Sequence, residues 1–128
     1  MGADSVDVII SALKKLLATG GDDGFVIFND PTHPQHYVQF TQASAGNLYG
    51  EAVSNAFLPP DDHLDAQQDA RMLALGWKAP VQGSENYFDR WSVSSDEVLL
   101  EVAMRVMRTF EEVFHHSMDT PLEVELEC

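Results

Sequence analysis

The chain has 128 residues, 45% of them hydrophobic, which is enough for one domain with a single core spanning residues 1–128. Its 21 acidic residues outnumber its 7 basic ones and give a formal net charge of −14. This balance argues against nucleic acid or anionic membrane as a partner, because both are bound through clustered Lys and Arg. The acidity suits either solubility or the attraction of a basic partner.

Targeting and redox signals are absent from the sequence. No run of about 18 apolar residues predicts a membrane span. The first residues carry aspartates in place of a basic signal-peptide region, and the lone Cys128 has no second cysteine with which to form an internal disulfide. These features predict a cytoplasmic protein.

Near the N-terminus, apolar residues recur at steps of three and four, which predicts an amphipathic helix with one buried face. Asp4 or Ser5 is the expected N-cap and Gly20-Gly21 the expected end. Packing on a sheet is the main interpretation, and a helix that docks on a partner is the alternative. The apolar positions are Val6, Ile9, Ile10, Leu13, Leu16 and Leu17.

Three strands are predicted next, over residues 25–28, 37–41 and 48–57. Short turns join them, which favours an antiparallel meander because parallel neighbours need a longer crossover. In the third strand Gly50, Ala52 and Ala56 form a small-residue face, on which we expect a helix. Tyr49 and Glu51 point to the other, partly wet face.

Pro59-Pro60 is the expected end of that strand, because proline cannot donate to a sheet ladder. A helix is then predicted over Ala66 to Leu75, with Asp65 and Gln68 as a capping box. Gly76 supplies a left-handed C-terminal residue, and Trp77 follows as an anchor.

Residues 86–93, rich in aromatic side chains, predict a fourth strand. Ser94 and Glu97 read as a capping box for a long helix that continues to about His116. In the tail, Leu122, Val124 and Leu126 alternate with glutamates, which predicts either an edge strand or a frayed acidic terminus. The fold class is therefore α+β, an antiparallel sheet of four to five strands in the order α-β-β-β-α-β-α.

Catalytic and metal motifs are missing. The five histidines lack the spacing of known metal sites, no G-x-S-x-G occurs, and no glycine-rich phosphate loop is present. We therefore expect no catalytic residue, no metal and no cofactor. The alternative is a small metal- or ligand-binding enzyme that uses His33, His36 and His63, and it requires these side chains to converge in space.

One set of residues carries a family resemblance. The segment Leu48 to Asn55, LYGEAVSN, is followed by Leu58, Leu64, Leu75-Gly76-Trp77, Pro80 and an Asn86-aromatic pair. From Phe25 to Phe114 this pattern resembles the type III secretion chaperone-like and YbjN-like peptide-binding chaperones of bacteria. The resemblance implies the α+β layout above and small, acidic, usually dimeric proteins that hold an extended segment of a partner without nucleotide. It brings no catalytic residue with it.

The leading hypothesis is a non-enzymatic, chaperone-like module that binds a protein or peptide segment at a sheet edge or in a groove beside the sheet. Exposed aromatics among Tyr37, Tyr87, Phe88 and Trp91 are the candidate contacts, although each of them also suits a place in the core. A third hypothesis is a structural subunit that forms a homodimer through the long helix or the tail.

Overall fold

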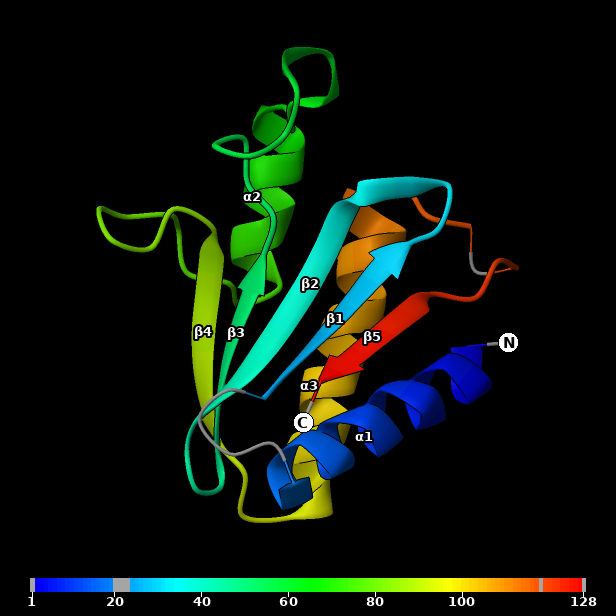
Figure 1. Ribbon diagram of the computed structural model, residues 1–128. Helices are drawn as coiled ribbons and strands as arrows, with labels where there is room; N and C mark the ends of the chain where they lie inside the picture. Colours follow the sequence, from blue (N-terminus) through cyan, green and yellow to red (C-terminus); the bar gives the residue numbers. More distant parts are fainter. Residues whose placement is uncertain (1, 20–23, 118, 128) are drawn as a thin grey trace.

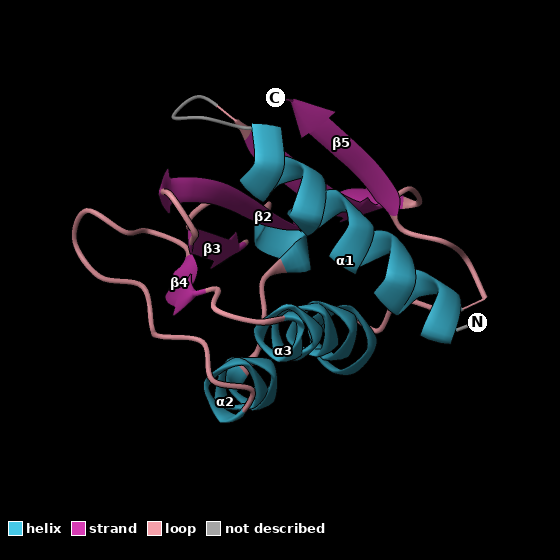
Figure 2. Cartoon of the chain, turned by 90° about the horizontal axis from the view of Figure 1, so that it is seen from below, coloured by secondary structure: helices cyan, strands magenta, loops and turns pink. Residues whose placement is uncertain are grey.

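The computed structural model describes residues 2–19, 24–117 and 119–127. It confirms the α+β class: a five-stranded antiparallel sheet in the order β4-β3-β2-β1-β5 carries the helices on one face (Figures 1 and 2). The helices are α1 (Gly2–Thr19), the 3-10 turn η1 (Pro60–Asp62), α2 (Ala66–Ala74), α3 (Asp96–Arg108) and the π-helical turn η2 (Thr109–Val113). The strands are β1 (Phe25–Asp30), β2 (His33–Ser44), β3 (Asn47–Ala52), β4 (Tyr87–Ser92) and β5 (Glu123–Glu127).

The tail is a strand of the chain's own sheet. β5 pairs with β1 in register Phe25↔Glu127 to Asn29↔Glu123 and so forms one sheet edge. β2 is longer than expected, because only residues 31 and 32 separate it from β1. The predicted helix end at Gly20-Gly21 and the thiol of Cys128 lie outside the described residues.

Alternation along the strands divides the sheet into two faces. The inner face, packed against α1 and α3, carries the fully buried side chains of Val26, Phe28, Val38, Phe40 and Leu48. Gly50 faces inward as expected, but the space above it is filled by rings of neighbouring strands. A Cβ there would lie 2.6 Å from Phe40 Cε1 and 2.8 Å from Trp91 Cζ3.

β3 ends earlier than predicted. The strand stops at Ala52, and the amide of Ser54 donates to Asn86 Oδ1 at 3.0 Å. The amides of Phe57 and Leu58 both donate to the Ser54 carbonyl, so the chain turns before Pro59 is reached. Local turn hydrogen bonds, which the apolar pattern does not reveal, override the expected extension to residue 57.

α2 follows the sequence closely. The Asp65–Gln68 capping box is present, with the Gln68 amide 2.8 Å from Asp65 Oδ1 and the Asp65 amide 2.9 Å from Gln68 Oε1. Gly76 has φ 106°. Trp77 is 2% exposed and donates from Nε1 to Thr109 Oγ1 at 3.0 Å, which fixes the end of α2 against the α3–η2 junction.

Two expectations for the helix termini are wrong. α1 begins at Gly2, so Ser5 lies inside the helix and does not cap it. The N-cap of α3 is Ser95, one residue later than predicted, and it makes no side-chain capping bond. Three residues after Ser95 stands Val98, which has no acceptor with which to complete a capping box.

The long C-terminal helix also differs from the predicted single α-helix to His116. After Arg108 the backbone widens into η2, with the Phe114 amide donating to the Thr109 carbonyl at 3.1 Å. This wider turn keeps Thr109, Phe110, Val113 and Phe114 all buried. η2 ends at Val113 with Phe114 as its C-cap, and the next residue, His115, is a non-glycine residue with φ 56°.

A buried ion cluster ties β4 to α3. Asp89 accepts hydrogen bonds from Lys78 Nζ and Arg105 Nη1, both at 2.6 Å. The Arg105 guanidinium lies over the rings of Trp77 and Trp91, at 5.3 Å and 4.7 Å. Burial would by itself raise the pKa of Asp89, but the hydrogen bonds from Lys78 and Arg105 outweigh it and hold that pKa below its usual range.

Candidate functional site

The sheet face that carries no helix is the first candidate surface, and we call it the open face (Figure 2). Its side chains are half-buried or exposed, in contrast to the buried residues with which they alternate. They are Phe25, Ile27 and Asn29 of β1, Tyr37, Gln39 and Thr41 of β2, Asn47, Tyr49 and Glu51 of β3, Phe88, Arg90 and Ser92 of β4, and Glu123, Glu125 and Glu127 of β5.

An aromatic cluster lies at the β3–β4 side of the open face. The rings of Tyr49 and Phe88 are stacked, with centroids 6.3 Å apart. The Arg90 guanidinium lies 5.0 Å from the Tyr49 ring centroid and 5.8 Å from that of Phe88. This flat assembly of π surfaces and one cation is suited to contact with another chain, since aromatic and arginine side chains dominate binding energy at interfaces.

Hydrogen bonds hold the polar neighbours of this cluster in place. Gln39 donates from Nε2 to Glu51 Oε1 at 2.8 Å. Asn86 donates from Nδ2 to the Tyr37 hydroxyl at 3.2 Å, and the Tyr49 hydroxyl lies 3.2 Å from Ser84 Oγ. The open face is thus pre-organised, which lowers the entropy cost of binding.

Charge on the open face is mostly negative. Its charged side chains are one basic residue, Arg90, and four acidic ones: Glu51, Glu123, Glu125 and Glu127. The glutamates of β5 occupy the edge strand, where charged side chains also discourage sheet-to-sheet aggregation.

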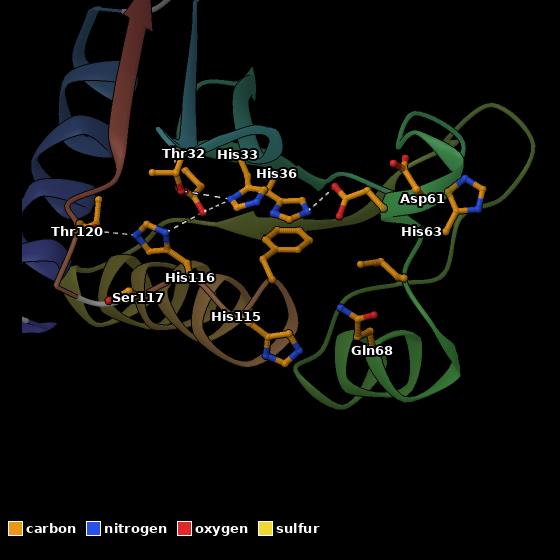
Figure 3. A pocket seen from close by; sticks show the side chains of 14 residues that line it. Thr32, His33, His36, Asp61, His63, Gln68, His115, His116, Ser117 and Thr120 are labelled. Carbon is orange, nitrogen blue, oxygen red and sulfur yellow. Dashed lines mark hydrogen bonds and ion pairs between the residues drawn. The ribbon is translucent and has the colours of Figure 1, made fainter.

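A second candidate is a pocket of about 510 Å³ at the end of the helix-covered side of the sheet (Figure 3). It is lined by all five histidines of the chain, namely His33, His36, His63, His115 and His116. They come from three separate segments: the start of β2, the residue after η1, and the chain after η2. Asp30, Asp61 and Asp62 also line it, together with Leu64 and Phe114.

His116 joins the end of η2 to β1. Its Nδ1 lies 3.0 Å from Asp30 Oδ2, and its Nε2 lies 2.7 Å from the Thr120 carbonyl oxygen. Asp30 also accepts from the amide and hydroxyl of Thr32, at 2.8 Å and 2.7 Å. Burial raises the pKa of Asp30, yet the bonds from Thr32 and His116 outweigh it and hold that pKa far below its usual range.

His36 joins β2 to η1. Its Nε2 lies 2.9 Å from Asp62 Oδ2, to which Gln35 also donates at 3.0 Å. The imidazole is stacked between His33 and Phe114, with centroid distances of 5.4 Å and 4.8 Å and interplanar angles of 14° and 7°. Burial lowers the pKa of His36, and the neighbouring His33 lowers it further. The negative charge of Asp62 raises it, but not enough to cancel the effect of burial.

Comparison with known protein families decides the identity. Residues 10–127, nearly the whole chain, match the family described as T3SS (YopN, CesT) and YbjN peptide-binding chaperone 3. The chain belongs to this family. No curated protein and no solved structure matches the sequence.

In this member of the peptide-binding chaperone family, the four aromatic residues that the sequence singled out lie on both faces of the sheet, two on each. Tyr37 and Phe88 lie half-buried on the open face. Tyr87 is 5% exposed, faces the core and donates to Asp69 Oδ1 at 2.5 Å. Trp91 also faces inward, with its ring 5.8 Å from that of Phe40.

Two further residues belong to this group by position. Tyr49 and Arg90 share the open face with Tyr37 and Phe88. Strand alternation already placed Tyr49 beside Glu51, so the signal for it was present in the sequence. No local signal in the sequence reveals the contact of Arg90 with two rings, because Tyr49 and Phe88 lie on different strands.

The histidines do converge, as the enzyme alternative requires, but their geometry gives that alternative no further support. Within residues 2–19, 24–117 and 119–127, no group of three or more His, Cys, Asp or Glu side chains is placed to hold a metal ion. Both nitrogens of His116 are engaged, and the rings of His33 and His36 stack face to face. A chaperone family implies a role in binding, without catalysis.

None of the helices in the described part of the chain is long and apolar enough to cross a membrane.

Proposed function

We propose that this protein is a non-enzymatic, chaperone-like module that holds an extended segment of a partner protein on its open face. The observation that carries the proposal is the cluster of the half-buried rings of Tyr49 and Phe88 with the exposed Arg90 guanidinium, on a sheet face without a helix. Membership of a peptide-binding chaperone family supports it. Tyr37 is the further aromatic contact on this face.

The charge of the open face favours a basic partner segment. Glu51 and the three glutamates of β5 attract Lys and Arg side chains, and the aromatic cluster accepts apolar or cationic ones. Five strands about 4.8 Å apart are about 19 Å wide between the outer two, so an extended segment of about six residues crosses the whole sheet.

Binding to synthetic peptides tests the proposal. The probes are fluorescent peptides of about nine residues, long enough to cross the sheet, in which apolar positions alternate with Lys, with Glu or with Ser. We expect measurable binding of the Lys series and a loss of about tenfold or more in affinity for a Tyr49→Ser/Phe88→Ser variant, since each buried aromatic anchor contributes more than 1 kcal/mol.

The matched control is Val8→Ser/Leu100→Ser, which removes two apolar side chains that are 51% and 48% exposed on α1 and α3. It should bind the Lys peptides as well as the native chain does. Equal loss in the control, or unchanged affinity in the open-face variant, would count against the open face as the binding surface. Circular dichroism of both variants excludes unfolding as the cause.

The homodimer implied by the family resemblance and the cytoplasmic location predicted from the sequence belong to the same proposal. Light scattering at tens of micromolar measures the first, because the mass of an obligate dimer does not fall to that of one chain at such concentrations. Fractionation of expressing cells measures the second.

A further inference from the structure

The pocket that gathers the five histidines joins three segments that are distant in sequence. Asp30 and His36 come from the β1–β2 hairpin, Asp62 from η1, and His116 from the chain after η2. Two histidine–aspartate contacts make the junction, His36–Asp62 at 2.9 Å and His116–Asp30 at 3.0 Å. Figure 3 shows them side by side across the pocket.

His36 is the weak point of this junction. A carboxylate only accepts, so the imidazole Nε2 that faces Asp62 carries the proton. The other nitrogen, Nδ1, is buried and has no hydrogen-bond partner. In the neutral ring it is an acceptor without a donor, and in the protonated ring it would be a buried donor without an acceptor, which is the more costly state.

The ring cannot reach water without parting its neighbours. His33 covers one face of the imidazole and Phe114 the other, and the side chain as a whole is 9% exposed. Hydration of a protonated His36 therefore requires the stack to open and the contact with η1 to loosen.

We propose that His36 is a proton-operated latch that holds η1 (Pro60–Asp62) against the start of β2, and that mild acid opens this junction and exposes the pocket walls formed by Leu64 and Phe114. The latch works whether or not a peptide lies on the open face. An imidazole is the side chain whose ordinary pKa lies in this pH range.

The other charged groups around His36 leave the direction of the effect unchanged. They come from every neighbouring segment: Asp30 from β1, His33 from β2, Asp61 and Asp62 from η1, His63 from the residue after η1, and His115 and His116 from the chain after η2. Burial and the charge of His33 disfavour the protonated imidazole of His36 and outweigh Asp62 and Asp30, which favour it, so the pKa of His36 is lowered. The pKa of Asp30 is also lowered, so this carboxylate stays charged in mild acid.

The sign follows from linkage. The open state, with a hydrated His36, binds a proton at a higher pH than the closed state does, so acid favours opening. Above the ordinary histidine pKa of about 6.5 both states are neutral and the closed state loses nothing. Below it, the opening equilibrium rises by up to about tenfold per pH unit until His36 is also protonated in the closed state.

Amide hydrogen exchange by NMR on the full chain tests the latch between pH 7.5 and 5.5, with rates corrected for the chemical pH dependence. We expect the opening constants of residues 60–64 to rise at the acid end in the native chain. His36→Gln keeps a donor for Asp62 but cannot titrate in this range, so its constants should stay flat. The matched control His115→Gln removes an exposed histidine from the same pocket and should respond like the native chain.

Two results would overturn the proposal. One is a native chain with no acid rise at residues 60–64, and the other is a His36→Gln variant that keeps the rise. If His36→Gln does not fold, the native chain still decides, because the exchange rise and the chemical shift of the His36 ring protons must share one midpoint. A midpoint at or above that of a free imidazole would exclude His36 as the latch.

Discussion

Replacing Asp89 by asparagine isolates the energetics of the buried cluster between β4 and α3. The carboxylate is 12% exposed and accepts from two cations at 2.6 Å, while the Arg105 side chain is 14% exposed between two tryptophan rings. A neutral amide in place of the carboxylate would leave the Arg105 guanidinium buried without a counter-charge. Breaking a buried ion pair by removing one partner costs about 3–5 kcal/mol, and we expect a loss of this size in the free energy of unfolding.

Urea denaturation followed by tryptophan fluorescence measures the loss, because both tryptophans adjoin Arg105. The double variant Asp89→Leu/Arg105→Met removes both charges and should lose less than Asp89→Asn alone. Arg108→Met is the control: the Arg108 side chain is 54% exposed, so solvent screens its pair with Glu112 and the variant should unfold almost as the native chain does. A loss below about 1 kcal/mol in Asp89→Asn, or a loss in the double variant at least as large as in Asp89→Asn, would refute a stabilising buried pair.

Three further changes test other parts of the fold. Gly76→Ala should lower the free energy of unfolding, measured by thermal melts, by about 1–3 kcal/mol. Gly76 has φ 106°, and a Cβ there would lie 2.7 Å from Arg105 Nη2. Gly46→Ala should cost less, because Gly46, with φ 78°, has open space around it. Asp65→Ala removes the N-cap of α2 and should cost about 1 kcal/mol by urea denaturation, with Asp65→Asn nearly neutral. The pKa of Asp30 is lowered in the fold, so its ionised form stabilises the fold above the ordinary carboxyl pKa of about 3.9. Asp30→Asn should therefore lower the free energy of unfolding by about 3 kcal/mol at pH 7 and by progressively less below pH 4. A difference that does not shrink below pH 4 would contradict this account.

Local signals in the sequence were sufficient for most of the architecture. The α2 boundaries followed from a capping box and a glycine that act within a few residues, and the faces of β3 followed from simple alternation. The β5 strand was one of two open alternatives. Pairing with β1 decides in favour of the strand, and this pairing joins residues as far apart in the sequence as Phe25 and Glu127, which no local pattern encodes.

The errors have the opposite character. The π-helical turn η2 arises because Phe110, Val113 and Phe114 must all reach the core, and no glycine or proline marks it. The convergence of the histidines depends on that turn, since it places His115 and His116 at the pocket that His33 and His36 also line. In the sequence the five histidines look scattered, because the distances between them are set by tertiary packing.

The pairing of charges favours a role for the acidity beyond solubility. Within the described part of the chain, ion pairs are formed by Lys14, Arg71, Lys78, Arg105 and Arg108. All five lie on helices or in the loop before β4, and their partners are acids of β4 and α3–η2. Among the described residues, the three glutamates of β5 have no such partner, so uncompensated negative charge remains at that edge of the open face. Uniform acidity for solubility would not need this segregation, whereas a surface that attracts a basic segment does. Replacing Glu123, Glu125 and Glu127 by Gln should therefore slow association with Lys peptides and make the association rate less dependent on salt. The unfolding midpoint should stay almost unchanged. Stopped-flow mixing at two ionic strengths measures the association rate and its salt dependence.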